Sequence, residues 1–456
     1  MRKVRQTKCS SQMYYNPLFL QTPSIQEAAF YETDLGKLHQ SIPFKELAAN
    51  IASPSSVQSG RGRKPFLKVE GGIALMILKH YLGLSDELLI DRLNTDWCMQ
   101  YFCGVQLNAR RIKDKNLVSW WRCYIAKHLD IAQLQSVLIS RWKPYMEQTH
   151  VTMMDATVYE SNIRYPTDAK LLWESIEKVY QIHQKKRKLL KLRSSRSNYG
   201  KHKKNYLGYQ RNRKKSRRKD KSLRKQLLKY LLRLLQGLQD LQTRYQFGLS
   251  NKERKLINNI KLIYDQQHEL IYGDRENVKH RIVSLDKPYV RPIIRGKEVK
   301  PVEFGAKVHK IQVGGLSFIE HLSYENFNEG TRLKRSVAFH QKHFGRCKQL
   351  GADAIYATNE NRRYCHSLGI ATSFIAKGKQ GKLEEQKSAM RSALSNVRAT
   401  VLEGSFGNEK NHYLLNKVKA KTQPTEIAWI FFGMLTANAS IISKRMQQPK
   451  QLRQTG

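Results

Sequence analysis

Residues 151–163, VTMMDATVYESNI, place one acid, Asp155, inside an apolar and β-branched run. Such a run predicts a buried strand of about six residues. A carboxylate is costly to bury unless a cation such as a metal ion meets it. Asp155 is therefore a candidate metal ligand, although an ordinary acid that is hydrogen-bonded at a strand end would leave the same pattern.

Two further acids follow downstream. Asp353 is carried by a short predicted strand, and Glu403 lies in residues 397–421, which predict a helix. Phosphodiester chemistry spreads negative charge over the transferring phosphoryl group, and two divalent cations about 4 Å apart can hold its attacking and leaving oxygens. Mg²⁺ takes few protein carboxylates and keeps water and phosphate oxygens as its other ligands. Three acids that are far apart in sequence fit that need.

The elements that must position these acids alternate between strands and helices. Residues 282–286, 304–315 and 316–326 predict strands, and Gly314-Gly315 between the last two is a hairpin signal. The later part of the chain predicts helices at residues 331–344 and 359–367 and a strand at residues 370–376. This order predicts an α/β fold in which Asp155, Asp353 and Glu403 reach one edge of a mixed sheet.

The amino-terminal part predicts a different organisation. Residues 1–60 show little periodicity and end in a small polar run, so they predict an extension and a linker. Residues 61–145 predict an all-helical domain, with helices at 69–81 and 88–93. A short Gly-containing turn between two helices could form a DNA-reading helix-turn-helix. The second helix carries acids where a groove reader needs bases, which favours a structural or dimerising role.

The composition points to nucleic acid as the partner. Lys and Arg number 82 against 37 Asp and Glu, for a net charge of +45, far more than solubility requires. The apolar run at residues 427–439 is too short to span a bilayer and predicts a buried helix, so no membrane partner is expected. The amino terminus has no apolar stretch typical of a secretory signal, which predicts a cytoplasmic protein. Six thinly spread cysteines without a CxxC pair predict reduced thiols.

Residues 169–279 predict a helical, highly basic insertion. Between residues 184 and 225 stand twenty Lys and Arg and one acid, Asp220. Such a run would repel itself without counter-charge, so we expect it to contact the DNA phosphate backbone, which gives affinity without sequence specificity. Leucine-rich helices at residues 223–242 and 256–271, with residues 168–192, predict a hairpin or small bundle. The candidate contacts are Lys185, Lys186, Arg187, Lys188, Lys203, Lys204, Arg211, Arg213, Lys214, Lys215, Arg217, Arg218 and Lys219.

Several blocks of the chain resemble bacterial insertion-sequence transposases of the DDE type. These blocks are MMDATVYESNIRYPTD, RPIIRGK with EFGAKV, ADAIYATNENRRYC and VRATVLEGSFGNEK, and the helical block before them is similar to the amino-terminal domain of that family. The resemblance implies an RNase H-like catalytic core with Mg²⁺ or Mn²⁺ as cofactor, and Asp155, Asp353 and Glu403 as the metal-binding acids. From the second block, Arg291, Arg295 and Lys297 join the candidate DNA contacts.

The third acid of that family commonly stands in a pattern of Tyr, Arg, Glu and Lys. Glu403 and Lys410 keep the seven-residue step, which places both on one helix face. Arg398 stands one residue further from Glu403 than the pattern asks, and Ser395 stands where a Tyr is expected. We therefore take Glu403, Lys410 and Arg398 as catalytic candidates and expect Lys410 to contact DNA near the scissile phosphate.

Other acids could take the places of these three. Glu160 and Asp168 compete with Asp155, Glu360 competes with Asp353, and Glu409 and Glu426 compete with Glu403. A zinc site is an alternative for another group of residues, but its ligand spacing matches no common structural finger, which favours ordinary polar helix residues. That group is His340, His343, Cys347, Cys365 and His366.

The sequence thus predicts a metal-dependent DNA transposase. Residues 146–168 and 280–445 would form the catalytic core and residues 446–456 a flexible tail. Its expected partners are the terminal inverted repeats of its element and target DNA, bound by a homodimer or higher oligomer at the bacterial nucleoid. A non-catalytic nucleic-acid-binding protein and an RNase H-like nuclease without strand transfer remain alternatives.

Overall fold

The computed structural model describes residues 22–54, 66–107, 111–194, 197–273, 278–295, 301–377 and 384–448. The chain divides into two compact units. The first, here the sheet unit, comprises Met1–Glu160, Lys307–Ser323 and Phe327–Gly456. The second, here the bundle unit, comprises Ser161–Ala306 and Tyr324–Asn326.

A mixed sheet forms the centre of the sheet unit. Among the described residues its main strands lie in the order β4-β3-β1-β5-β6, and β7 pairs with β1. Strand β5 runs parallel to β1 and β6 runs parallel to β5, whereas β3 and β4 are antiparallel. The bounds are β1 (Val151–Ser161), β3 (Val302–Val313), β4 (Leu316–Ser323), β5 (Gln349–Ala352), β6 (Ala371–Thr372) and β7 (Lys417–Val418). This combination of sheet and helices confirms the predicted α/β class.

Strand β1 is the central strand, and its sequence explains its place. It is buried along almost its whole length, as expected for an apolar, β-branched strand with neighbours on both sides. It extends over 11 residues, which is longer than the periodicity predicts. The predicted hairpin between β3 and β4 is confirmed: Gly314 and Gly315 both adopt positive φ, of 53° and 75°, which other residues rarely tolerate.

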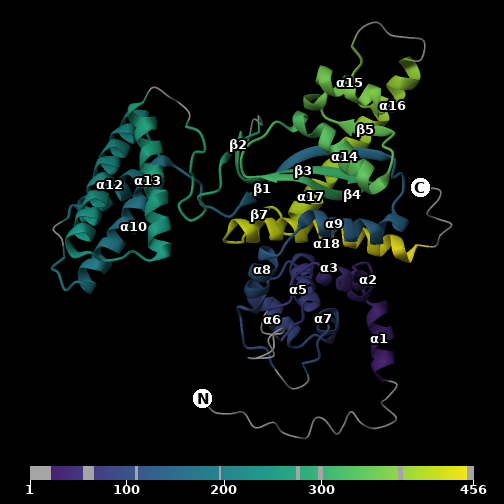
Figure 1. Cartoon of the computed structure of the whole chain (residues 1–456), viewed down its shortest axis with the longest axis horizontal. Coiled ribbons are helices and arrows are strands. Elements are labelled where there is room, and N and C mark those ends of the chain that lie inside the picture. The colour runs from purple at the N-terminus through teal and green to yellow at the C-terminus, as the bar shows by residue number, and fades with distance from the viewer. Residues whose placement is uncertain are drawn as a thin grey trace. The chain divides into compact units, whose positions relative to one another are not determined.

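Helices pack around this sheet (Figure 1). They are α14 (Leu333–Phe344), α15 (Asn359–Ser367), α16 (Glu384–Val397), α17 (Glu403–His412) and α18 (Gln423–Gln447). Helix α18 contacts β4, β7 and α17 as well as the helices α2, α5 and α8. It is long and apolar enough to cross a membrane, but 83% of its most apolar window is buried inside the fold. The prediction of a buried helix here is confirmed.

The amino-terminal helices differ in part from the sequence analysis. The structure has helices α5 (Val69–Leu82) and α6 (Asp86–Leu93) at the predicted positions, followed by α7 (Trp97–Phe102), α8 (Leu117–Lys127) and α9 (Ile131–Trp142). Residues 1–60, for which the sequence analysis predicted an extension and a linker and assigned no element, contain three helices among the residues that the structure describes. Helices α1 (Thr22–Glu32), α2 (Asp34–Gln40) and α3 (Phe44–Ala49) form there because Phe30, Leu38 and Leu47 are buried in the sheet unit. Of the predicted linker at residues 53–65, residues 55–65 lie outside the described residues.

Three other predicted elements are corrected. Residues 282–286 form no strand, because Ile282 and Leu285 are buried in the core of the bundle unit instead. The strand expected at residues 370–376 is only Ala371–Thr372, since Ser373 turns its hydroxyl group to the backbone of Ala352. The helix expected to reach residue 421 ends at His412, just before Leu414, which adopts a positive φ of 58°.

The bundle unit consists of α10 (Asp168–Leu189), α11 (Tyr199–Arg211), α12 (Arg217–Tyr245) and α13 (Asn251–Tyr272), with α10, α12 and α13 side by side (Figure 1). Leucines and isoleucines at helical spacing, such as Leu227 and Ile260, form one shared core. The predicted bundle is therefore present, and α11 is a helix that the sequence analysis did not predict. In the same unit β2 (Pro292–Ile294) pairs with residues 302–304.

Candidate active site

Asp155 lies in β1, and Asp353 directly follows the adjacent parallel strand β5. Met154 of β1 pairs with Ala352 of β5, so the next residue along the chain after each of these two is one of the acids. Each carboxylate accepts a hydrogen bond from the following backbone N–H, from Ala156 at 2.7 Å and from Ala354 at 2.7 Å. Neighbouring strands are about 4.8 Å apart. The parallel pairing therefore brings two of the three predicted acids to the same place on the sheet.

The environment of Asp155 favours a cation. Its side chain is only 17% exposed, and burial raises the pKa of its carboxyl group. The negative charges of Glu329 and Asp353 raise this pKa further, while Arg398 lowers it. A carboxylate that is desolvated and close to other acids gains most from a positive charge nearby.

Arg398 links Asp155 to Glu403. Its Nη1 donates to Asp155 Oδ2 at 3.2 Å and lies 3.3 Å from Glu403 Oε1. The segment Arg398–Leu402 is a π-helix that leads directly into α17. A π-helix brings residues five apart together, as an α-helix does for residues four apart. The extra residue between Arg398 and Glu403 is thus absorbed, and both side chains meet in spite of the altered spacing.

Lys410 also reaches β1. Its Nζ donates to Thr157 Oγ1 at 3.1 Å. Thr157 lies two residues after Asp155, so the two side chains point to the same face of the strand. Glu403 and Lys410 are seven residues apart on α17, or about two turns. The helix therefore places a base beside the strand that carries the first acid.

The structure brings together only part of the predicted metal site. Among the described residues no group of three or more His, Cys, Asp or Glu lies close enough to hold a metal ion. Asp155 and Asp353 are neighbours, whereas the Glu403 side chain is 52% exposed and meets Asp155 through Arg398. The carboxylate oxygens of the pair are the donors that Mg²⁺ and Mn²⁺ prefer, so their chemistry fits a divalent ion.

A fourth acid, Glu329, was missed by the sequence analysis. It lies in the turn Glu329–Arg332 before α14, and Lys307 of β3 is 2.8 Å from its carboxylate. Its charge raises the pKa of Asp155. Glu329 stands between the strand predicted at residues 316–326 and the helix predicted at residues 331–344, so no pattern of its own marked it.

A buried ion pair lies beneath the site and was also missed. Lys310 of β3 and Glu409 of α17 are 2.7 Å apart, and their side chains are 0% and 2% exposed. Tyr159 of β1 donates its hydroxyl group to the same carboxylate. Burial lowers the pKa of Lys310 and raises that of Tyr159. These contacts join β3 to β1, which carries Asp155, and to α17, which carries Glu403 and Lys410.

The acids that compete with the three candidates interact with other residues or are buried. Glu409 is held by Lys310, Glu160 lies 2.9 Å from Lys417, and exposed Glu360 pairs with Lys334. Asp168 belongs to the bundle unit, where Arg224, Gln267 and Arg281 donate to it at 3.2, 2.8 and 2.6 Å. Glu426 is 1% exposed within α18. None of these acids directly follows the residue that pairs with Ala352, as Asp155 does.

The described residues do not support the zinc alternative. They contain no metal-binding cluster of His and Cys. Cys347 and Cys365 are buried in one apolar cluster, and burial raises the pKa of their thiols to about 12 and about 11. His340 is buried, and burial lowers its pKa to about 4. These residues act as packing groups.

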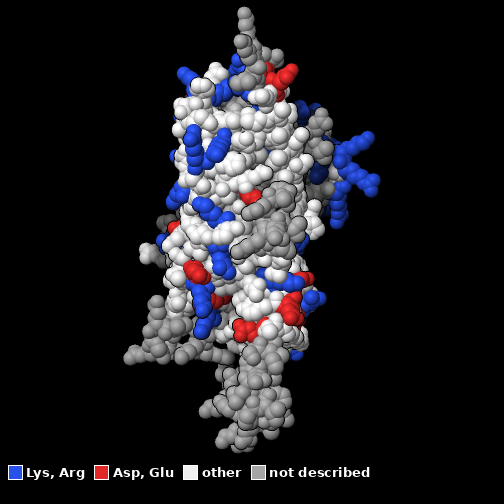
Figure 2. Space-filling view, turned by 90° about the vertical axis from the view of Figure 1, so that its right-hand side faces the viewer, with Lys and Arg blue, Asp and Glu red and all other residues white. Residues whose placement is uncertain are grey.

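The candidate DNA contacts differ in how exposed they are and in whether they interact with other residues of the protein. Most of those between residues 185 and 219 are exposed, but Lys186 is 3.1 Å from Glu253 and donates to the backbone of Gly248. Arg291 donates to the carbonyls of Pro288 and Val290, and Arg295 lies 3.4 Å from Glu303. Lys297 lies outside the described residues. Figure 2 shows another face of the molecule, where Lys and Arg are dispersed and Asp and Glu lie mainly toward the lower end of the view.

Comparisons with known proteins identify two transposase regions. Residues 350–439 match a family model described as "Transposase DDE domain", and residues 25–123 match one described as "Transposase domain (DUF772)". The first region contains Asp353, Glu403 and Lys410, whereas Asp155 and the bundle unit lie outside both. No curated protein and no solved structure matches the chain. The mixed sheet with a DDE domain is consistent with an RNase H-like core. Both matched regions are transposase domains, and together they support an insertion-sequence transposase of the DDE type.

Proposed function

We propose that this transposase cleaves DNA at the ends of its element and joins the exposed 3′-hydroxyl end to target DNA with the help of divalent metal ions. The observation that carries the proposal is the placement of Asp155 in β1 and of Asp353 just after the adjacent parallel strand β5, in an environment that favours a positive charge. Two carboxylates so placed can hold a metal ion against a phosphate.

The chain's own residues have distinct roles in this proposal. Asp155, Asp353 and Glu403 would hold the ions. A bound Mg²⁺ or Mn²⁺ would stabilise the charge on the scissile phosphate and activate the attacking oxygen. Arg398 keeps Glu403 beside Asp155, and Lys410 supplies a positive charge for DNA close to β1. The basic bundle unit would hold the DNA backbone.

The sharpest test separates strand transfer from simple cleavage. The substrates are two matched duplexes that carry the DNA flanking the gene. The first is cut beforehand so that it ends in a 3′-hydroxyl group, and the second ends in a 3′-deoxy nucleotide. In the presence of Mg²⁺ we expect the protein to join only the first duplex to a target plasmid, because the hydroxyl group is the nucleophile.

The matched variants are Asp353→Asn and Glu360→Gln. Asp353→Asn should abolish joining, whereas Glu360→Gln should retain it, because Glu360 is exposed and pairs with Lys334. Cleavage of uncut ends without any joining would support a nuclease instead. Joining that survives Asp353→Asn would refute the assignment of Asp353.

A further inference from the structure

A basic groove lies between α11 and α12 of the bundle unit. Its volume is about 800 Å³. Of the described residues that line it, four are cationic and none is acidic. The cations are all exposed, so they are available to a partner in solution. They are Lys203, Lys204, Arg211 and Lys219, and the neutral polar residues Asn205, Asn212, Ser222 and Gln226 lie between them.

The acid nearest to these cations in sequence is already neutralised. Asp220 pairs with Arg224 at 2.7 Å and accepts a hydrogen bond from the Tyr209 hydroxyl group at 2.6 Å. It therefore leaves the positive charge of the groove uncompensated. The groove also lies at the amino-terminal end of α12, where the helix dipole favours an anion.

Neither packing nor backbone conformation explains two glycines of α11. Gly200 and Gly208 both line the groove, and a Cβ atom added at either would meet no heavy atom within 4 Å. Neither adopts a positive φ. By contrast, a Cβ at Gly72 would lie 2.2 Å from the Trp121 ring, so packing explains that glycine.

A glycine in a helix costs about 1 kcal/mol relative to alanine. Neither packing nor backbone conformation offsets this cost at Gly200 and Gly208. Glycine is used where another backbone or a ligand must come close to the chain. The open space beside both residues therefore indicates a close contact with something outside the fold.

We propose that the groove between α11 and α12 receives the phosphate backbone of duplex DNA, with Gly200 and Gly208 admitting one strand close to the α11 backbone. Lys203, Lys204, Arg211 and Lys219 would neutralise its phosphates, and the amide side chains would donate hydrogen bonds. This inference rests on the proposed function only in taking DNA as the substrate.

The first test fills the groove without removing any charge. Gly208→Leu should weaken binding of a labelled DNA duplex by about tenfold or more, because its side chain occupies the space of the strand. Gly237→Ala in α12 is the control, since it also improves helix propensity but lies outside the groove. Gly208→Ala should have an intermediate effect on affinity. None of these variants should lower helix content in circular dichroism.

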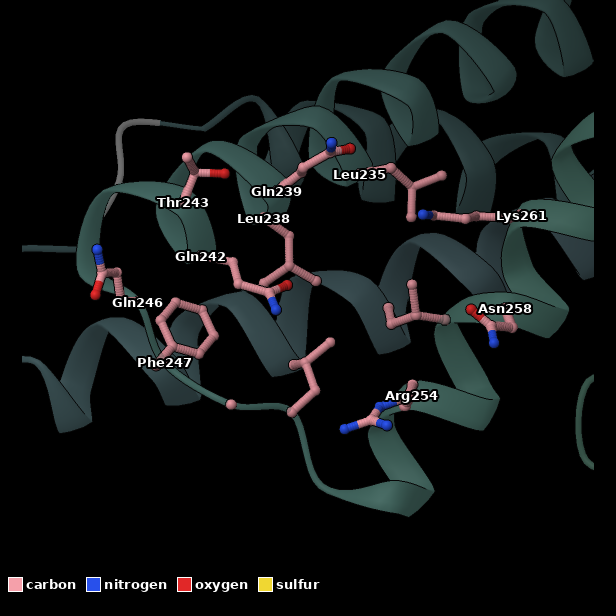
Figure 3. A pocket seen from close by; sticks show the side chains of 13 residues that line it. Leu235, Leu238, Gln239, Gln242, Thr243, Gln246, Phe247, Arg254, Asn258 and Lys261 are labelled. Atoms are coloured by element: carbon pink, nitrogen blue, oxygen red, sulfur yellow. The ribbon is translucent and has the colours of Figure 1, made fainter.

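The second test compares the loss of one positive charge from the groove with the loss of one positive charge from another hollow of the bundle unit. Lys204→Ala should reduce the slope of log K against log salt by about 0.9, as expected for one lost phosphate contact. Lys261→Ala removes the same charge from a different hollow, of about 680 Å³, which lies between α12 and α13 beside Leu238 and Phe247 (Figure 3). It should leave the slope nearly unchanged.

The outcomes separate this inference from the proposed function. If the unaltered protein binds duplex DNA and Gly208→Leu binds it equally well, the groove assignment is wrong although the transposase proposal stands. If the unaltered protein joins no DNA ends but the groove variants still lose affinity, the inference holds and the proposed reaction fails. Competition by duplex RNA as strong as that by duplex DNA would overturn the choice of DNA.

Discussion

Asp155→Asn should lower the rate of metal-dependent DNA cleavage by on the order of a thousandfold, because a catalytic metal ion contributes several kcal/mol to transition-state stabilisation. The amide keeps the size of the side chain but cannot supply the negative charge that holds a cation. Since burial already raises the pKa of Asp155, a neutral side chain should not weaken the fold. The rate would be measured on end-bearing duplex DNA in Mg²⁺, and DNA affinity by fluorescence anisotropy.

Glu160→Gln is the matched control on the same strand. Glu160 also lies in β1, but its carboxylate pairs with Lys417 at 2.9 Å. Its loss should leave cleavage nearly unchanged, and both variants should keep their DNA affinity. A cleavage rate in Asp155→Asn close to that of Glu160→Gln would show that Asp155 holds no catalytic ion.

Glu409→Gln should destabilise the sheet unit by about 3–5 kcal/mol, because it leaves the buried ammonium group of Lys310 without its counter-charge. For a unit of this size the thermal midpoint should fall by about 5–8 °C. Cleavage should weaken too, since Glu409 anchors the helix that carries Glu403 and Lys410. Differential scanning fluorimetry measures the first effect.

Two variants test whether the burial of the charge causes the loss of stability expected for Glu409→Gln. Lys417→Met breaks the more exposed pair with Glu160 and should cost at most about 1 kcal/mol. A triple variant with Lys310→Met, Glu409→Leu and Tyr159→Phe removes all three polar partners together and should recover most of the lost stability. Equal midpoints for Glu409→Gln and Lys417→Met would contradict the role given to the buried pair.

The sequence could predict those helices and strands that are determined by a few neighbouring residues. The apolar run around Asp155 gave β1, and the paired glycines at 314 and 315 gave the hairpin, because only glycine readily adopts both positive φ angles. The α15 bounds were also predicted, since Thr358 accepts a hydrogen bond from the Asn361 N–H as a helix cap. Such signals depend on a few neighbouring residues.

Elements that depend on distant packing could not be predicted in this way. Ile282 and Leu285 are apolar, as buried strand residues are, but they are buried against the helices of the bundle unit. Helix α2 is short and has only a few apolar residues, of which Leu38 reaches the core. Periodicity alone does not reveal which surface will cover such residues.

The residues of the candidate site also divide into those that local sequence predicts and those that only the fold brings together. The positions of Asp155 and Asp353 follow from two strand patterns, and parallel pairing makes them neighbours. The π-helix that brings Arg398 to Glu403 could not be foreseen, because the altered spacing only indicated a mismatch. Glu329 and Lys310 come from segments whose local sequence carries no signal, and only the fold places them near Asp155.

The most direct test of the central claim measures metal binding without any reaction. Free Mn²⁺ would be followed by electron paramagnetic resonance as it is titrated into the DNA-bound protein. The account predicts that the unaltered protein binds Mn²⁺ and that the Asp155→Asn, Asp353→Asn double variant loses this binding, while Glu160→Gln keeps it. Equal Mn²⁺ binding by the unaltered protein and the double variant would contradict the claim that these two acids form the metal site.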